Sequence, residues 1–192
     1  MPALGVRLTL RIKVPHLAVR SLFAETTPQG ATLCCKHLEK GFEMADLQAA
    51  AKRVARFREV MAQRGYDAVV LRHNPDLRWL TDAERTFDFE QAHTAFITQD
   101  ELFMHTDSRY YNTFLERLGA DSPWKFDQEV TTPTEWVAAH IAEARARVVA
   151  IEDTVDLAFF DGLEQALRDR SVAALLPRMH GDIAELRIVK DP

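Results

Sequence analysis

The chain has 192 residues, of which 47% are apolar and 28% charged, and its formal net charge is −5. This mixture is typical of a globular domain and excludes a collagen-like, low-complexity or wholly disordered chain. The negative charge argues against a nucleic-acid binder. No apolar run approaches the roughly 18 residues of a membrane-spanning helix, so we expect neither nucleic acid nor a membrane as a partner. The two cysteines, Cys34 and Cys35, are neighbours, which excludes a disulfide framework and favours a reducing, cytoplasmic location.

Charge divides the sequence near Met44. Residues 1–43 carry six basic and three acidic side chains, a net charge of +3, whereas residues 44–192 carry −8. Apart from an alternating apolar run at 8–14, the first segment has no sustained pattern. We expect it to be a leader or disordered extension, or a stretch that precedes a true start at Met44. The alternatives are an N-terminal arm that packs on a partner and a transit peptide.

From Met44 the pattern predicts alternating helices and strands. Apolar residues at three- and four-residue steps predict a helix over 47–61, which Gly65 ends. A buried strand follows at 67–71, and Asn74 and Pro75 are suited to cap and start a short helix that ends at Leu80. Residues 82–93 are largely polar and aperiodic, which predicts a loop.

The second half continues the alternation and contains one hairpin. The expected strands are 94–98, 102–106, 124–126, 148–151 and 172–176. The expected helices are 108–118, 132–144, 157–167 and 182–188. Together these elements predict a three-layer α/β/α domain with a mixed sheet over residues 44–189. Asp191 and Pro192 form a helix-start signal where the sequence stops, so we expect residues 190–192 to begin a linker to a further domain.

Residue types that carry chemistry are scarce. There is no metal-binding histidine pair, phosphate-binding glycine loop or nucleophile elbow, so we expect this chain to hold no catalytic and no metal-binding residue. Four acids lie close together in the 82–93 loop, with Arg85 among them: Asp82, Glu84, Asp88 and Glu90. Such carboxylates suit a divalent cation, but a solvated acidic loop is the commoner case.

One constellation stands out, at the end of the 102–106 strand. Asp107 is placed to cap the following helix, and Arg109 is suited to pair with a carboxylate. Tyr110 and Tyr111 add amphipathic rings that suit an interface. A capped helix with a surface ion pair would produce the same pattern.

Residues 44–192 resemble the N-terminal domain of the creatinase/prolidase/aminopeptidase P family. The resemblance rests on four ordered segments: Gly65–Val70, with its preceding helix, Arg72–Thr81, Leu102–Tyr110 and Leu186–Pro192. Within the second segment, Trp79 stands where the family usually has tyrosine, and Asp82 follows where glycine is usual.

The resemblance implies a ribonuclease H-like α/β domain that is not itself catalytic. In the family, a C-terminal "pita-bread" domain holds two divalent metal ions (Mn, Co or Zn) on two Asp, one His and two Glu, and the enzymes are commonly homodimers. We therefore expect the N-terminal domain of an Xaa-Pro peptidase, with Trp79, Arg109, Tyr110 and Tyr111 covering substrate or an interface, and Asn74 and Asp107 structural. The alternatives are a stand-alone interaction module, the corresponding domain of a metal-free creatinase-like amidinohydrolase, and a self-sufficient enzyme that uses the 82–93 carboxylates.

Overall fold

A six-stranded mixed sheet organises the domain in the order β4-β3-β2-β1-β5-β6. The computed structural model describes residues 44–83, 86–87, 90–127 and 130–188. The strands are β1 Ala68–Leu71, β2 His93–Thr98, β3 Leu102–Thr106, β4 Trp124–Asp127, β5 Val149–Glu152 and β6 Arg178–Met179. The helices are α1 Leu47–Arg64, α2 Asn74–Thr81, α3 Ser108–Leu118, α4 Pro133–Ala144, α5 Leu157–Asp169 and α6 Asp182–Ile188. β1 pairs antiparallel with β2 and parallel with β5, so the sheet is mixed, as predicted.

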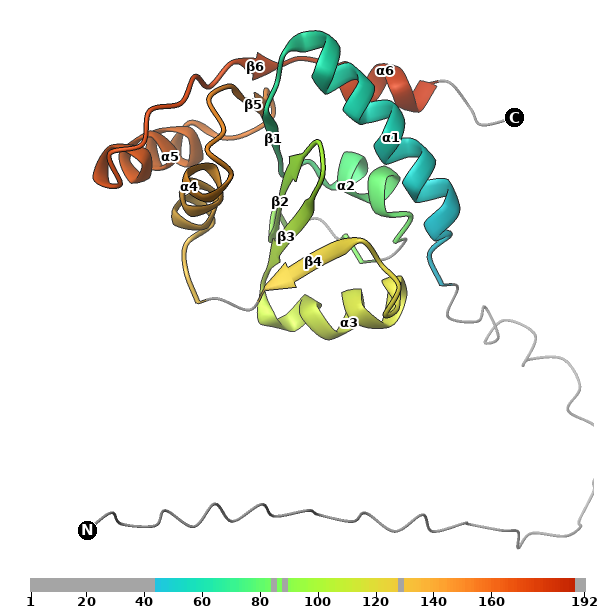
Figure 1. Ribbon diagram of the computed structural model, residues 1–192. Coiled ribbons are helices and arrows are strands. Elements are labelled where there is room, and N and C mark those ends of the chain that lie inside the picture. Colours follow the sequence, from blue (N-terminus) through green and yellow to red (C-terminus); the bar gives the residue numbers. More distant parts are fainter. Residues whose placement is uncertain (1–43, 84–85, 88–89, 128–129, 189–192) are drawn as a thin grey trace, which may run out of the picture. The chain divides into compact units, whose positions relative to one another are not determined.

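Helices cover both faces of this sheet, because the buried strands are apolar on both sides. In β1, Val69 and Leu71 join a core with α1, α2, α3 and α6, whereas Ala68 and Val70 join a second core with α4 and α5. Figure 1 shows the two helix groups on opposite sides of β1 and β2. The predicted three-layer α/β class is confirmed.

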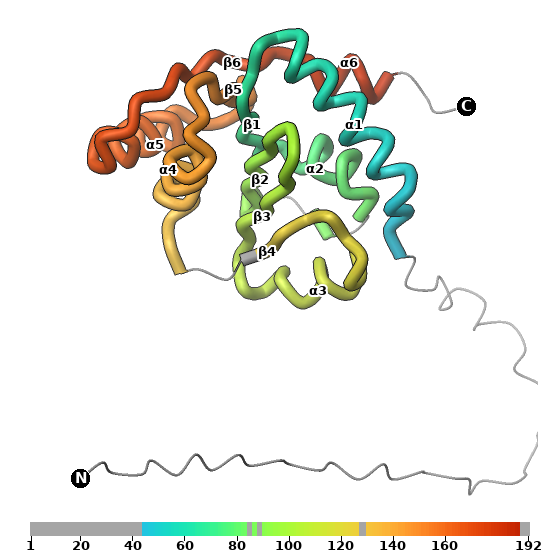
Figure 2. Tube along the Cα trace, viewed as in Figure 1, coloured from blue at the N-terminus to red at the C-terminus, as the bar shows by residue number. Residues whose placement is uncertain are grey.

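The first helix has the boundaries that its sequence predicts. The Asp46 carboxylate caps α1 by accepting hydrogen bonds from the Gln48 and Ala49 N–H groups. Gly65 ends α1 in a left-handed conformation with φ 71°, which glycine adopts without steric cost. Helix α1 lies beside α6, the last helix that the structure describes, as the tube in Figure 2 shows. An ion pair of 3.0 Å between Arg64 and Asp182 joins the two helices.

The predicted cap of α2 is wrong. His73 occupies the N-cap position but its side chain does not cap a backbone N–H; its Nδ1 lies 2.9 Å from Asp76 Oδ2, and Asn74 is already the first helical residue. Before the helix, the Oε1 of Glu152 on β5 accepts a hydrogen bond of 2.7 Å from the Arg72 N–H. The Asn74 side chain does not cap the helix and instead donates a hydrogen bond to the Glu90 carbonyl.

The predicted strand at 172–176 is also wrong in its position. Only Leu175 of that stretch forms a bridge, to Val148, and the strand β6 lies further on at Arg178–Met179. Val172, Ala174 and Leu176 pack instead against the α4–α5 core. Pro177 contributes no N–H to the ladder, which limits the regular pairing between these stretches.

None of the helices that the structure describes is both long and apolar enough to cross a bilayer. The predicted leader at 1–43, both cysteines and the predicted linker start at 190–192 lie outside the described residues.

Candidate functional site

The candidate site is the corner where β3 ends and α3 begins. Asp107 is the N-cap of α3, and its Oδ1 accepts a hydrogen bond of 2.9 Å from the Arg109 N–H. The predicted structural role of Asp107 is thus confirmed. A short aspartate cap satisfies backbone donors that a helix start leaves open. The turn therefore fixes the direction in which the next side chains leave the helix.

Arg109 lies between two carboxylates at this corner. Its Nε donates to Asp107 Oδ1 at 3.1 Å, and its Nη2 donates to Glu90 Oε2 at 3.1 Å. These hydrogen bonds, that to Asp107 first, raise the pKa of the Arg109 guanidinium above its ordinary value. The Arg109 side chain and backbone N–H conversely lower the pKa of Asp107. With both carboxylates ionised, the corner carries one net negative charge.

Tyr110 connects this ion pair to the core. Its hydroxyl lies 3.5 Å from Glu90 Oε2, and its ring meets His93 edge-on, with 4.8 Å between ring centroids. His93 is buried at the start of β2, where its Nδ1 lies 2.8 Å from the Thr106 hydroxyl of β3. Glu90, Arg109 and Tyr110 therefore rest on a buried hydrogen-bonded support.

The segment that carries Glu90 is held in place by side chains from neighbouring elements. Arg78 donates to the Phe87 carbonyl at 3.0 Å, and Asn74 donates to the Glu90 carbonyl at 3.0 Å. Arg72 donates to the Gln91 carbonyl at 2.9 Å. In the described part of the predicted loop, three side-chain donors on or beside α2 thus bind backbone carbonyls that a helix or strand would otherwise pair with backbone N–H groups.

Arg72 and Glu152 are buried structural supports near the candidate site that the sequence analysis missed. The buried Arg72 guanidinium lies over the Phe159 ring, 4.4 Å from its centroid, and 3.8 Å from an Asp156 carboxylate oxygen. Burial lowers the pKa of Arg72 and raises that of Glu152. Each is a charged residue at the end of an apolar strand. A charged side chain in that position is ordinarily expected to be exposed, so no sequence signal marks either residue as buried.

The other two predicted site residues have different surroundings. The Trp79 carbonyl accepts a hydrogen bond of 3.0 Å from Arg53, whose guanidinium lies 5.8 Å from the centre of the Trp79 ring. Arg53 also pairs with Asp82 at 2.7 Å. Tyr111 meets the Phe126 ring of β4 edge-on at 6.4 Å. The structure thus unites Arg109 and Tyr110 around Glu90 and gives Trp79 and Tyr111 separate contacts.

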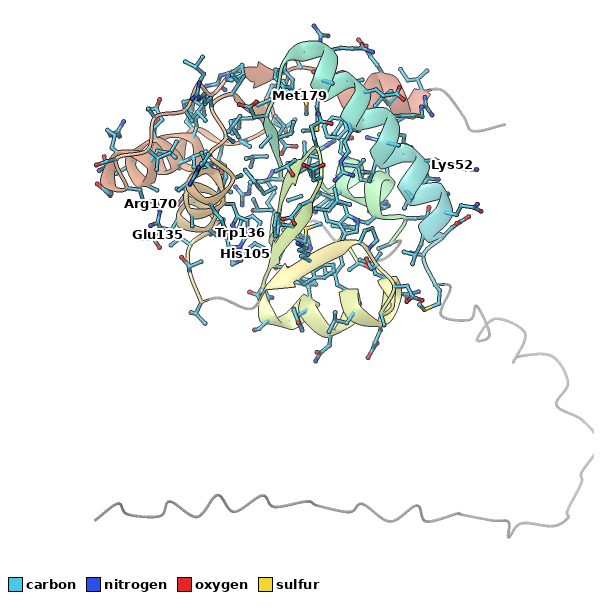
Figure 3. All side chains as sticks on the ribbon, viewed as in Figure 1. Lys52, His105, Glu135, Trp136, Arg170 and Met179 are labelled. Atoms are coloured by element: carbon cyan, nitrogen blue, oxygen red, sulfur yellow. The ribbon has the colours of Figure 1, made fainter. Side chains whose placement is uncertain are left out.

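A hollow of about 530 Å³ opens beside the corner, lined by Glu90, His105, Asp107, Arg109 and the stretch around Thr131. His105 is one of the lining residues and stacks on Trp136 of α4, with 5.2 Å between ring centroids. Figure 3 labels these two side chains, which lie near one another. In the part of the chain that the structure describes, no three His, Cys, Asp or Glu side chains are grouped to hold a metal ion. Glu84, Arg85 and Asp88 of the predicted acidic loop lie outside the described residues.

Comparison with models of protein families shows which family this chain belongs to. The model of the creatinase/prolidase N-terminal domain matches residues 53–189, which is most of the chain. The chain belongs to this family. No curated protein is similar enough in sequence to count as a match.

Solved structures with the same fold include several peptidases or parts of them. An Xaa-Pro aminopeptidase from Streptococcus thermophilus has 20% identity and a TM-score of 0.60, with 72% of this chain and 98% of that chain covered. An Xaa-Pro dipeptidase from Bacillus anthracis has 19% identity and a TM-score of 0.62, with 74% and 37% covered. The N-terminal domain of the cytoplasmic peptidase PepQ from Mycobacterium tuberculosis has 20% identity and a TM-score of 0.58, with 71% and 98% covered.

At these identities the likeness shows the fold alone. The present domain spans nearly all of two of these chains but little more than a third of the dipeptidase.

Proposed function

We propose that this chain is the non-catalytic N-terminal domain of an Xaa-Pro peptidase of the aminopeptidase P or prolidase type. Its membership of the creatinase/prolidase N-terminal domain family is the observation that carries the proposal. The catalytic domain would follow in the same protein and would hold two divalent metal ions. We also propose a homodimer and a cytoplasmic location.

Within this function, the corner around Arg109 covers the entrance to the active site. Support comes from its exposure beside a hollow and from its net negative charge, which suits the free ammonium group of an Xaa-Pro substrate. Asp107 and Glu90 fix the guanidinium of Arg109 by hydrogen bonds, so the charges are held in place before substrate arrives. Tyr110 keeps the corner attached to the β2–β3 support.

Metal ions held by that catalytic domain would supply the activation of water for peptide hydrolysis. The described residues of this chain do not fit such a centre, because they contain no grouped set of three suitable ligands. We therefore assign them covering and assembly and no step of the reaction itself.

The test compares two arginine variants in the protein that contains both this domain and its catalytic domain. Arg109→Ala removes the guanidinium that orients the Glu90 and Asp107 carboxylates. Although the corner becomes more negative, the loss of this fixed geometry is expected to lower kcat/KM for an Xaa-Pro dipeptide by about tenfold, a loss of ~1.4 kcal/mol. Arg168→Ala is the matched control, because Arg168 is 61% exposed against 62% for Arg109 and also pairs with a glutamate. Equal activity of the two variants would refute the covering role.

A second arm tests whether this chain is itself an enzyme. The purified chain is incubated with Mn²⁺ and an Xaa-Pro dipeptide, and no turnover above a metal-only blank is expected. Turnover that disappears in Glu84→Gln or Asp88→Asn would instead establish the self-sufficient enzyme. Binding of another protein without any role in peptide hydrolysis would favour the stand-alone module.

A further inference from the structure

The β6 end of the sheet has an open edge, which includes the extended stretch that leads to β6 from α5 (Figure 1). Leu175 uses both of its backbone groups toward β5, and its N–H donates to the Arg147 carbonyl at 2.7 Å. Because backbone direction alternates along an extended chain, the groups of Ala174, Leu176 and Arg178 face outward. Among the residues that the structure describes, none hydrogen-bonds to these outward groups.

The proline of this stretch does not block the outward edge. Proline lacks an N–H and is therefore a common means of closing an edge strand. Pro177, however, lies at an inward-facing position, where its carbonyl accepts a hydrogen bond of 2.9 Å from the Ile151 N–H. The outward N–H groups of Leu176 and Arg178 are unaffected by it. The edge is thus able to bind an extended peptide by backbone hydrogen bonds, the mode called strand addition.

An apolar hollow lies beside the open edge. It has a volume of about 680 Å³ and lies between α5 and the extended stretch, with Phe160, Leu167, Val172 and Leu176 in its lining. On a strand added at the edge, every second side chain would face this side of the sheet. A side chain opposite Leu176 would therefore enter the hollow, which favours an apolar residue at that position of the peptide.

Arginines outnumber carboxylates around this hollow. Arg147 and Arg168 line it, and Arg178 lies over the Phe160 ring, 4.8 Å from its centroid. The one acidic residue of the lining, Glu164, already pairs with Arg168 at 3.6 Å. No described carboxylate forms an ion pair with Arg147 or Arg178. Three guanidiniums and one carboxylate leave two positive charges here, in a domain whose net charge is −8.

We infer that this edge binds an extended acidic peptide of a partner protein by strand addition. The peptide carries an apolar side chain opposite Leu176 and an acidic side chain two positions to either side. One carboxylate meets the guanidinium of Arg178, and the other meets that of Arg147, which lies beside Leu175 at the opposite end of the hollow.

The same charges decide between an acidic peptide and a second copy of this chain. A second copy would bring its own arginines against those around the hollow, and like charges across an interface are unfavourable. An acidic peptide instead supplies the carboxylates that this surface lacks. The inference does not depend on the proposed peptidase function, because it uses no residue of the corner around Arg109.

The test uses fluorescence anisotropy with the full 192-residue chain. The probe is a labelled peptide, Thr-Glu-Thr-Leu-Thr-Glu-Thr, whose pattern is the same in either direction. Because the interface is small, a dissociation constant on the order of 10–100 μM is expected at low salt. A control peptide with lysine in place of both glutamates is expected to bind at least about tenfold more weakly. Equal affinity for the two peptides would overturn the inference.

Two arginine variants locate the binding site. Arg178→Glu is expected to weaken binding of the acidic peptide by about tenfold. Arg170→Glu is the matched control, because Arg170 is also an exposed arginine but lies outside the lining of the hollow. It is expected to change the dissociation constant by less than about twofold. Equal effects of the two substitutions would contradict binding at this edge.

Hydrogen exchange separates strand addition from a contact made by side chains alone. The acidic peptide should slow exchange at the outward amides of Leu176 and Arg178. The amide of Leu175, which already bonds to the Arg147 carbonyl, should not change. Binding that leaves both outward amides unprotected would refute strand addition. Protection that appears when the concentration of the chain alone is raised would assign the edge to a second copy and would also overturn the inference.

Discussion

Replacing Phe87 by alanine tests whether the predicted 82–93 loop is part of the core. Phe87 is 2% exposed and meets the rings of His93 and Phe114 edge-on, each with 5.1 Å between centroids. Removal of a buried phenylalanine costs about 3–5 kcal/mol, through lost transfer free energy and the cavity that remains. The lost edge-on contacts are part of that cost, since each such pair contributes about 0.5–1.5 kcal/mol beyond its buried area.

The assay is urea unfolding of the full chain, with the free energy of unfolding obtained from the midpoint and slope. Leu115→Ala is the control, because Leu115 lies on α3 but is an exposed leucine, and its loss is expected to be within about 0.5 kcal/mol. A Phe87→Ala loss below about 1 kcal/mol would refute the packing of this segment against β2 and α3.

Two further changes test the supports of the candidate corner. Asp107→Ala removes the N-cap of α3 and is expected to destabilise the chain by about 1 kcal/mol in urea unfolding, whereas Asp107→Asn keeps a capping oxygen and should lose less; equal losses would contradict the capping role. Burial raises the pKa of Glu152, so the native state binds more protons than the unfolded state, and stability should fall as pH rises through the raised pKa. Glu152→Gln should flatten this part of the plot of Tm against pH, and parallel curves for the two proteins would show that Glu152 does not cause the dependence.

Local signals predicted the regular elements well. The Gly65 end of α1, the β2–β3 hairpin and the limits of α6 all follow from patterns that span a few residues. Such patterns act within one turn of helix or one strand pair. They are visible in the sequence because the interacting residues are close together in it.

The sequence reading failed where distant residues replace local ones. Glu152 accepts a hydrogen bond from the Arg72 N–H across 80 positions, so no local pattern could predict this contact. Phe87 is a single apolar residue in a polar segment, and only the three-dimensional structure shows that it fills a space between β2 and α3.

The candidate site shows the same difference between local contacts, which could be predicted, and distant contacts, which could not. The Asp107–Arg109 turn was predicted because its parts are two residues apart, and Arg109 was expected to pair with a carboxylate. The identity of Glu90 as the distant partner needed the fold, because 19 positions separate it from Arg109. No local sequence pattern predicts which distant residue a carboxylate in a loop will contact.

The coding DNA beyond the codon for Pro192 tests the proposed function most directly. The account predicts an open frame of roughly 200 codons or more, enough for a second domain, with the two Asp, one His and two Glu of a dinuclear metal centre. A frame that continues without this set would point to a metal-free relative. A stop codon directly after Pro192 would contradict the account and leave a stand-alone binding domain.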